Sequence, residues 1–171
     1  MSDTTIPPGA QAADAAQLLF AQRPWLIAHA NALIASFRAL LRRDLIKAAD
    51  DPLETALRLY HAPLAVLSHG TEQDPVLNFG NAIALSLWER DFDAFTRIPS
   101  RLTAEPMLRE ERERALRLVL SQGYVEDYSG VRVSATGRRF RIARAVVWNV
   151  ADAQGRPLGQ AAAFDQWTPL P

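Results

Sequence analysis

The order of predicted strands and helices is the feature that most constrains the fold of this chain. Two short apolar runs come first, a helical region follows, and three segments rich in β-formers close the chain. The strands are predicted at residues 64–67, 76–79, 124–134, 138–150 and 157–167. Strands at both ends of a segment with helices between them favour one five-stranded antiparallel sheet with short helices grouped on one face, an α+β fold.

Residues that cap or stop helices place the elements between the strands. Asn81 is expected to cap a short helix over 82–89, and 91–96 to form another helical turn or two. Residues 99–106 form a connector, and a charged helix is predicted over 107–122. Gly123 fits as the C-terminal stop of that helix.

The N-terminal part of the chain predicts a separate helical extension. Residues 1–11 are expected to be a disordered tail, 12–60 the extension, and 61–171 the α+β domain. Helices are predicted over 12–22 and 25–47, the second with an apolar stripe repeating every three or four residues. A third helix starts at Pro52, where Asp51 and Glu54 form a capping box.

Composition excludes several classes of function. The 171 residues contain no cysteine, which rules out disulfides and thiolate chemistry and makes the cytoplasm the expected compartment. The formal net charge is zero, so direct binding to nucleic acid or to an anionic membrane is not expected. No stretch predicts a signal peptide or a membrane span. The three histidines do not cluster with acidic residues, so no metal site is predicted.

Several short motifs follow one another along the second part of the chain. Residues 77–82 are similar to the PAS pattern in which a strand runs into an Asn-headed helix. The segments 97–106, 122–124, 128–132, 136–140 and 147–149 resemble the MEKHLA domain. MEKHLA is a PAS-like family with stand-alone bacterial members and plant members at the C-terminus of class III homeodomain–leucine zipper regulators. The resemblance covers roughly residues 61–167, leaves the N-terminal helices outside, and implies a PAS-like fold in a bacterial stand-alone member.

The resemblance also raises the question of a cofactor, because PAS-like domains hold flavin, haem, metabolites or nothing between sheet and helices. A photoactive flavin that forms a cysteine adduct is excluded, since the chain has no cysteine. No histidine follows Gly70, which argues against haem. The identity of any cofactor stays open.

By analogy with PAS hairpins, we expect Ala143, Ala145, Val147 and Asn149 to face the helices, together with Gln160, Ala162 and Phe164. Their small side chains leave two alternatives: a ligand cavity with Asn149 and Gln160 as polar anchors, or close packing without a cavity. The candidate pocket residues are Asn78, Asn81, Trp88, Arg101, Tyr128, Ala145, Val147, Asn149, Gln160 and Phe164.

Some of these candidates also have simpler interpretations. Asn78 and Asn81 suit a turn and a helix cap, with a hydrogen bond to a ligand as the alternative. Arg101 suits an anchor to Glu105 or to the sheet, with a bound carboxylate or phosphate as the alternative. Trp88 and Tyr128 suit core or rim positions.

The same register places Ile142, Val146 and Trp148 on the outer face of the sheet, which is too apolar to face water. We expect the amphipathic N-terminal helix to cover it, either from the same chain or from a partner in a homodimer.

The resulting prediction is a sensory or interaction module, not an enzyme, that acts as a homodimer and binds a small apolar or amphipathic metabolite, a protein partner, or both. One alternative is a small cavity-containing enzyme of the isomerase or hydrolase type, which would need an acid or histidine inside the cavity. Another is a transcriptional co-regulator, by analogy with the plant proteins.

Overall fold

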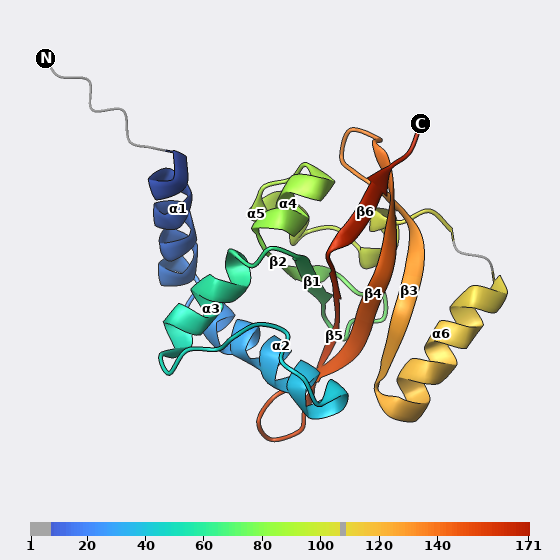
Figure 1. Cartoon of the computed structure of the whole chain (residues 1–171), viewed down its shortest axis with the longest axis horizontal. Helices are drawn as coiled ribbons and strands as arrows, with labels where there is room; N and C mark the ends of the chain where they lie inside the picture. The colour runs from blue at the N-terminus through green and yellow to red at the C-terminus, as the bar shows by residue number, and fades with distance from the viewer. Residues whose placement is uncertain (1–7, 107–108) are drawn as a thin grey trace, which may run out of the picture.

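The computed structural model describes the backbone of residues 8–106 and 109–171 (Figure 1). The helices are α1 (Pro8–Gln22), α2 (Trp25–Leu41), α3 (Pro52–Tyr60), α4 (Ala82–Trp88), α5 (Phe92–Phe95), the 3-10 helix η1 (Ser100–Thr103) and α6 (Arg109–Gln122). The strands are β1 (Ala65–His69), β2 (Leu77–Gly80), β3 (Tyr124–Val133), β4 (Arg139–Ala151), β5 (Pro157–Phe164) and β6 (Gln166–Pro169). Residues 1–7 of the predicted tail lie outside the described part, and α1 already begins at Pro8.

The strands form one antiparallel sheet in the order β2-β1-β5-β4-β3, which confirms the predicted fold class. The sheet has six strands, one more than predicted, because the last predicted strand bends at Asp165 and becomes two. The shorter piece, β6, pairs with the first part of β4, from Phe140 to Ala143. β5 pairs with the second part of β4, from Val146 onward.

The N-terminal helices cover the outer face of the sheet within the single chain. Residues of α1, α2 and α3 form one buried cluster with outer-face residues such as Val66, Val146 and Trp148. Trp148 is fully buried, packs edge-on against Phe37 with ring centroids 5.0 Å apart, and donates its indole N–H to the carbonyl of Leu33 over 3.2 Å. In Figure 1 these three helices lie together on one side and α6 lies on the other.

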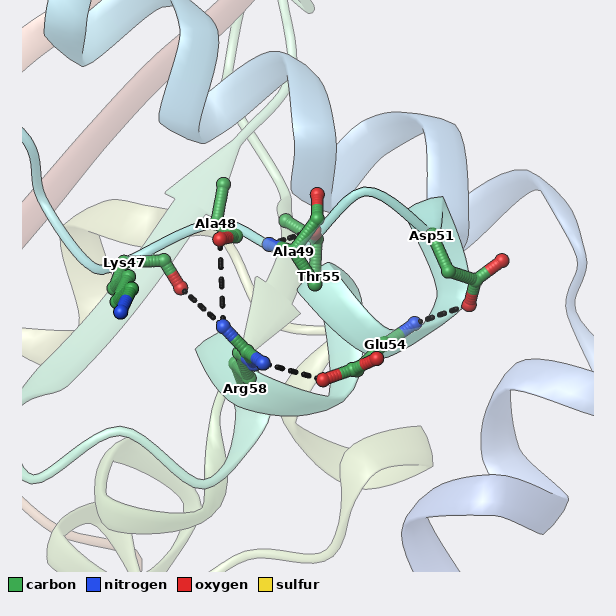
Figure 2. A network of polar contacts seen from close by, with 7 residues as sticks. All are labelled: Lys47, Ala48, Ala49, Asp51, Glu54, Thr55 and Arg58. Atoms are coloured by element: carbon green, nitrogen blue, oxygen red, sulfur yellow. Dashed lines mark hydrogen bonds and ion pairs between the residues drawn. The ribbon is translucent and has the colours of Figure 1, made fainter.

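The second helix ends earlier than predicted. Arg42 adopts a left-handed conformation (φ 58°) and caps α2 at Leu41, so 42–51 form a loop instead of two further helical turns. Figure 2 shows how this loop is held against α3: Thr55 exchanges hydrogen bonds with the backbone of Ala49, and Arg58 donates to the carbonyls of Lys47 and Ala48.

The Asp51 half of the predicted capping box of α3 is confirmed, whereas the Glu54 carboxylate binds Arg58. The Asp51 carboxylate accepts from the Glu54 N–H over 2.8 Å (Figure 2). The capped helix and the loop together hold α2 and α3 as one helical layer.

A bulge in β4 changes the predicted register. Arg144 has a φ of 54°, and the pairing with β3 shifts between Gly130–Ile142 and Tyr128–Ala145. The extra residue reverses the alternation of the strand. Ile142 therefore lies in the inner cluster and not on the outer face, and Ala143 does not share the face of Ala145. From Ala145 onward the predicted register holds.

The connector before α6 crosses the inner face from one edge of the sheet to the other. At its start, the Leu77 N–H donates to the carbonyl of Ile98 beside β2. At its end, the Glu105 N–H donates to the carbonyl of Val131 on β3. Both edge strands thus gain backbone partners, which limits edge-to-edge association.

Two tryptophans allow a matched test of the helical cover. Trp148→Ala is expected to lower the free energy of unfolding by about 3–5 kcal/mol, because it removes a buried ring that joins β4 to α2. At protein concentrations low enough to keep the chain monomeric, Trp25→Ala, the same change at a side chain that is 53% exposed in the single chain, is expected to cost less than about 1 kcal/mol. Urea denaturation measures both values, and equal losses would contradict the assigned roles.

Candidate functional site

An aromatic cluster occupies the inner face of the sheet, where the sequence predicts a pocket or close packing. Trp88, at the end of α4, is 1% exposed. Its ring centroid lies 5.9 Å from that of Phe95, 5.2 Å from that of Phe140 and 6.2 Å from that of Phe164, all in edge-to-face geometry. Its indole N–H donates to the carbonyl of Thr103 over 3.2 Å, which fastens the connector to this cluster. Close packing is therefore the arrangement here.

Both polar atoms of the Asn81 side-chain amide make hydrogen bonds within the chain. The side chain is fully buried; its oxygen accepts from the N–H groups of Ala84 and Val66, and its NH₂ donates to the carbonyls of Leu59 and Leu64. A single residue thus caps α4 and joins it to β1 and to the end of α3. No hydrogen-bonding capacity of Asn81 is left for a ligand.

Glu89 fixes the other end of α4 to the β3–β4 turn. Its carboxylate accepts from Ser134 over 2.6 Å, from Thr136, and from Arg138 over 3.0 Å. These hydrogen bonds, first that from Ser134, lower the pKa of Glu89 to about 2. The turn residues Thr136 and Arg138, part of the MEKHLA-like motifs, therefore hold the helix that carries Trp88.

One interpretation of the sequence expects Arg101 to anchor Glu105, but the structure does not pair these two residues. The Arg101 Nε lies 3.1 and 3.2 Å from the two carboxylate oxygens of Asp74, in the β1–β2 turn, and the pair is exposed. Glu105 instead binds Arg139, whose hydrogen bond lowers the pKa of that carboxyl group. The connector brings Arg101 to the edge of the sheet, away from the aromatic cluster.

The remaining pocket candidates lie on the inner face. Ala145 and Phe164 belong to the buried cluster, and Tyr128 packs against it opposite Ala145, with the Arg132 guanidinium 5.5 Å from its ring centroid. Val147 is half-buried on the same face.

Asn149 and Gln160 form the open end of the inner face. They are paired across β4 and β5, and the Gln160 amide donates to the Asn149 oxygen over 3.1 Å. Asn149 is exposed and Gln160 is half-buried, whereas the aromatic cluster is closed. The Asn149 NH₂ also donates to the carbonyl of Val119 on α6 over 3.5 Å. Each of the two amides still has hydrogen-bonding capacity left over, so this end of the face is the part that a polar ligand could reach.

A buried polar network under α2 was missed by the sequence analysis. The His29 Nε2 lies 2.9 Å from the Ser68 hydroxyl, which donates to the Asn78 amide oxygen over 2.6 Å. Asn78 thus contacts the outer side of the sheet and not the inner pocket, because it is the extra residue of an irregularity in the β1–β2 pairing. Burial lowers the pKa of His29 to about 4.

This network does not form a hydrolytic site. Ser68 is 2% exposed and directs its proton to Asn78, whereas a nucleophilic serine must reach substrate and give its proton to histidine. Among the side chains that the structure describes, no group of three or more His, Asp or Glu residues is placed to hold a metal ion. No helix among the described residues has the length and apolar character to cross a membrane.

A comparison with models of known protein families identifies the family of this chain. The model of the MEKHLA domain matches residues 27–169. The chain belongs to the MEKHLA domain family. The expected range of roughly 61–167, with the N-terminal helices outside, is too short: the match begins inside α2, so the family's shared sequence includes most of the helical layer as well as the sheet. The division of the chain at residue 61 stays a prediction.

The relatives of this MEKHLA protein include two rice proteins. It is 30% identical over 157 residues to the homeobox-leucine zipper protein HOX29 of Oryza sativa subsp. indica, covering 90% of this chain and 18% of that one. It is 25% identical over 164 residues to HOX9 of the same subspecies, covering 95% and 20% respectively. The chain thus spans about a fifth of the length of these relatives.

Solved PAS and light-oxygen-voltage domains share the fold. A PAS domain from Colwellia psychrerythraea superposes with a TM-score of 0.54 at 12% identity, covering 70% of this chain and 98% of that one. A light-oxygen-voltage domain studied with a flavin analogue gives 0.51 at 13% identity, covering 71% and 87%. In the MEKHLA chain described here, Trp88, Phe140 and Phe164 fill the centre of the inner face, which does not fit a flavin at that position.

The buried histidine predicts a pH dependence of stability. The unfolded chain keeps the ordinary histidine pKa of 6.5, and the folded value is about 4. As the pH falls from 6.5 towards 4, the unfolded state binds a proton that the folded state excludes, so stability present above pH 6.5 is lost over this window. The loss is at most about 3–4 kcal/mol.

His29→Gln is expected to flatten this part of the stability profile, because it removes the buried imidazole. Denaturant unfolding between about pH 7 and about pH 4.5 measures the slopes. An unchanged slope in His29→Gln would contradict the assignment.

Proposed function

We propose that this MEKHLA domain is a sensory or interaction module that works through protein contacts and acts as a homodimer. The observation that carries this proposal is the distribution of exposed apolar side chains. The described residues close both faces of the sheet around buried clusters. Of the five large apolar side chains that are exposed among the described residues, three lie on the N-terminal helices: Leu18 is 57% exposed, Trp25 53% and Leu53 38%. The other two, Leu102 and Leu120, lie on η1 and α6. Exposed apolar side chains gathered on one part of the surface support a protein–protein contact there.

The fold supports the same proposal. α2 is tied to the sheet at Trp148 and again at His29, so a change in the sheet is passed to the surface that carries Trp25. The homeobox–leucine zipper relatives carry the family's domain within much longer chains, which suits a module whose output depends on associated protein. A role as transcriptional co-regulator would use the same contacts, and the zero net charge argues against direct binding to DNA.

Sedimentation velocity of the full chain tests the homodimer. As the protein concentration is raised to about 100 μM, a dimer is expected to form, since interfaces of modest affinity associate within this range. A monomer throughout this range would contradict the proposal. Ser121→Glu, at an exposed position of α6 outside α1, α2 and α3, serves as a control for the effect of added charge.

A second candidate function is the binding of a small metabolite at the open end of the inner face. The exposed amide of Asn149 beside Gln160 favours it, since polar groups at the rim of an apolar surface are typical of ligand sites. The enzyme alternative has no comparable support, because neither of these residues is an acid or a histidine.

Native mass spectrometry of the protein as purified tests this second function. A retained small molecule is expected in the wild type and should be lost in Asn149→Leu, which removes the polar anchor. Gln154→Leu, in the exposed β4–β5 turn, should retain it. Wild-type protein without a bound molecule, even after addition of cell extract metabolites, would overturn metabolite binding and leave the homodimer standing.

A further inference from the structure

The exposed side of α2 carries a second regular stripe besides the one that covers the sheet. Its members alternate in steps of three and four residues: Trp25, Ala28, Ala32, Ala35, Ala39 and Arg42. Five of these side chains are exposed, and Ala32 is half-buried. This spacing is that of a helix that packs along another helix, and alanine at the central positions lets two helices approach closely.

The stripe has a protrusion at one end and a hollow at the other. Trp25, at the N-terminal end of α2, is 53% exposed. Near the C-terminal end, a shallow groove of about 450 Å³ is lined by Ala35, Arg38, Ala39 and Arg42. A large apolar side chain and an open groove with a small-residue floor are complementary in shape, and they lie about four helical turns apart on the same helix.

From this arrangement we infer that a second copy of the chain packs its α2 antiparallel against α2, about a twofold axis between Ala32 and Ala35. Ala28 then faces Ala39 of the second copy, and Ala32 faces Ala35. Trp25 enters the groove of the other copy beside Arg42, where the guanidinium contacts the ring face. The inference rests on the proposed homodimer and specifies its interface.

The charges on the helix select the antiparallel orientation. A parallel pair would place Arg42 beside Arg42 and Arg38 beside Arg38, and would leave each groove empty. The antiparallel pair separates these like charges and aligns the two helix dipoles favourably. The zero formal net charge of the chain adds no general repulsion between copies.

The absence of cysteine from the chain makes cross-linking a direct test, because any introduced thiol is unique. Ala28→Cys protein mixed with Ala39→Cys protein should form a disulfide-linked dimer under mild oxidation. Neither variant alone should do so, since equal positions lie roughly 16 Å apart along an antiparallel pair. Cross-links in each variant alone, with none between the two, would overturn the antiparallel register.

A charge substitution tests the same interface without oxidation. Ala35→Glu places two carboxylates close to the twofold axis and is expected to weaken dimerisation at least about 100-fold in sedimentation velocity. Ser121→Glu should have no effect. A wild-type dimer that Ala35→Glu leaves intact would overturn this interface but not the homodimer, whereas a wild-type monomer would overturn both. Circular dichroism should show both variants folded, because Ala35 is exposed.

Discussion

The attachment of α2 to the outer face of the sheet is the constraint on which the rest of the structure depends. β4 and β5 are apolar on both faces, so neither face can be left to water. Trp148 meets this requirement by burying its ring against Phe37 and donating its indole N–H to the backbone of the same helix. Once α2 is in place, the inner face can be closed by short helices alone.

The inner face is also closed by a buried tryptophan, but here the tryptophan belongs to a helix and not to the sheet. Here the tryptophan, Trp88, comes from the helical side and its ring meets aromatic side chains of the sheet. Its indole N–H again donates to a backbone carbonyl, that of Thr103 in the connector. A buried indole has to satisfy its N–H, and in both places that requirement joins two elements far apart in sequence.

Local sequence signals predict much of the fold, and the predictions that were wrong failed for physical reasons. The caps at Asp51 and Asn81 depend on neighbouring residues, so the sequence locates them correctly. The sequence gives no local signal for the bulge at Arg144, because arginine has no preference for a left-handed backbone and the pairings of β4 with distant strands fix the bulge there. The network of His29, Ser68 and Asn78 was hidden for a similar reason, since its three residues lie on α2, β1 and an irregular part of β2.

The arrangement of β4 suggests how binding and association would be coupled. Trp148 and Asn149 are adjacent residues that point to opposite faces: Trp148 is packed under α2, and Asn149 lies at the open end of the inner face. Because the aromatic cluster is closely packed, a ligand cannot enter the centre without displacing Trp88, at a cost of several kcal/mol. Contact with Asn149 requires no such displacement. A small shift of the β4 backbone there would move Trp148 against Leu33 and Phe37, and so act directly on the helix whose other side is exposed to a partner.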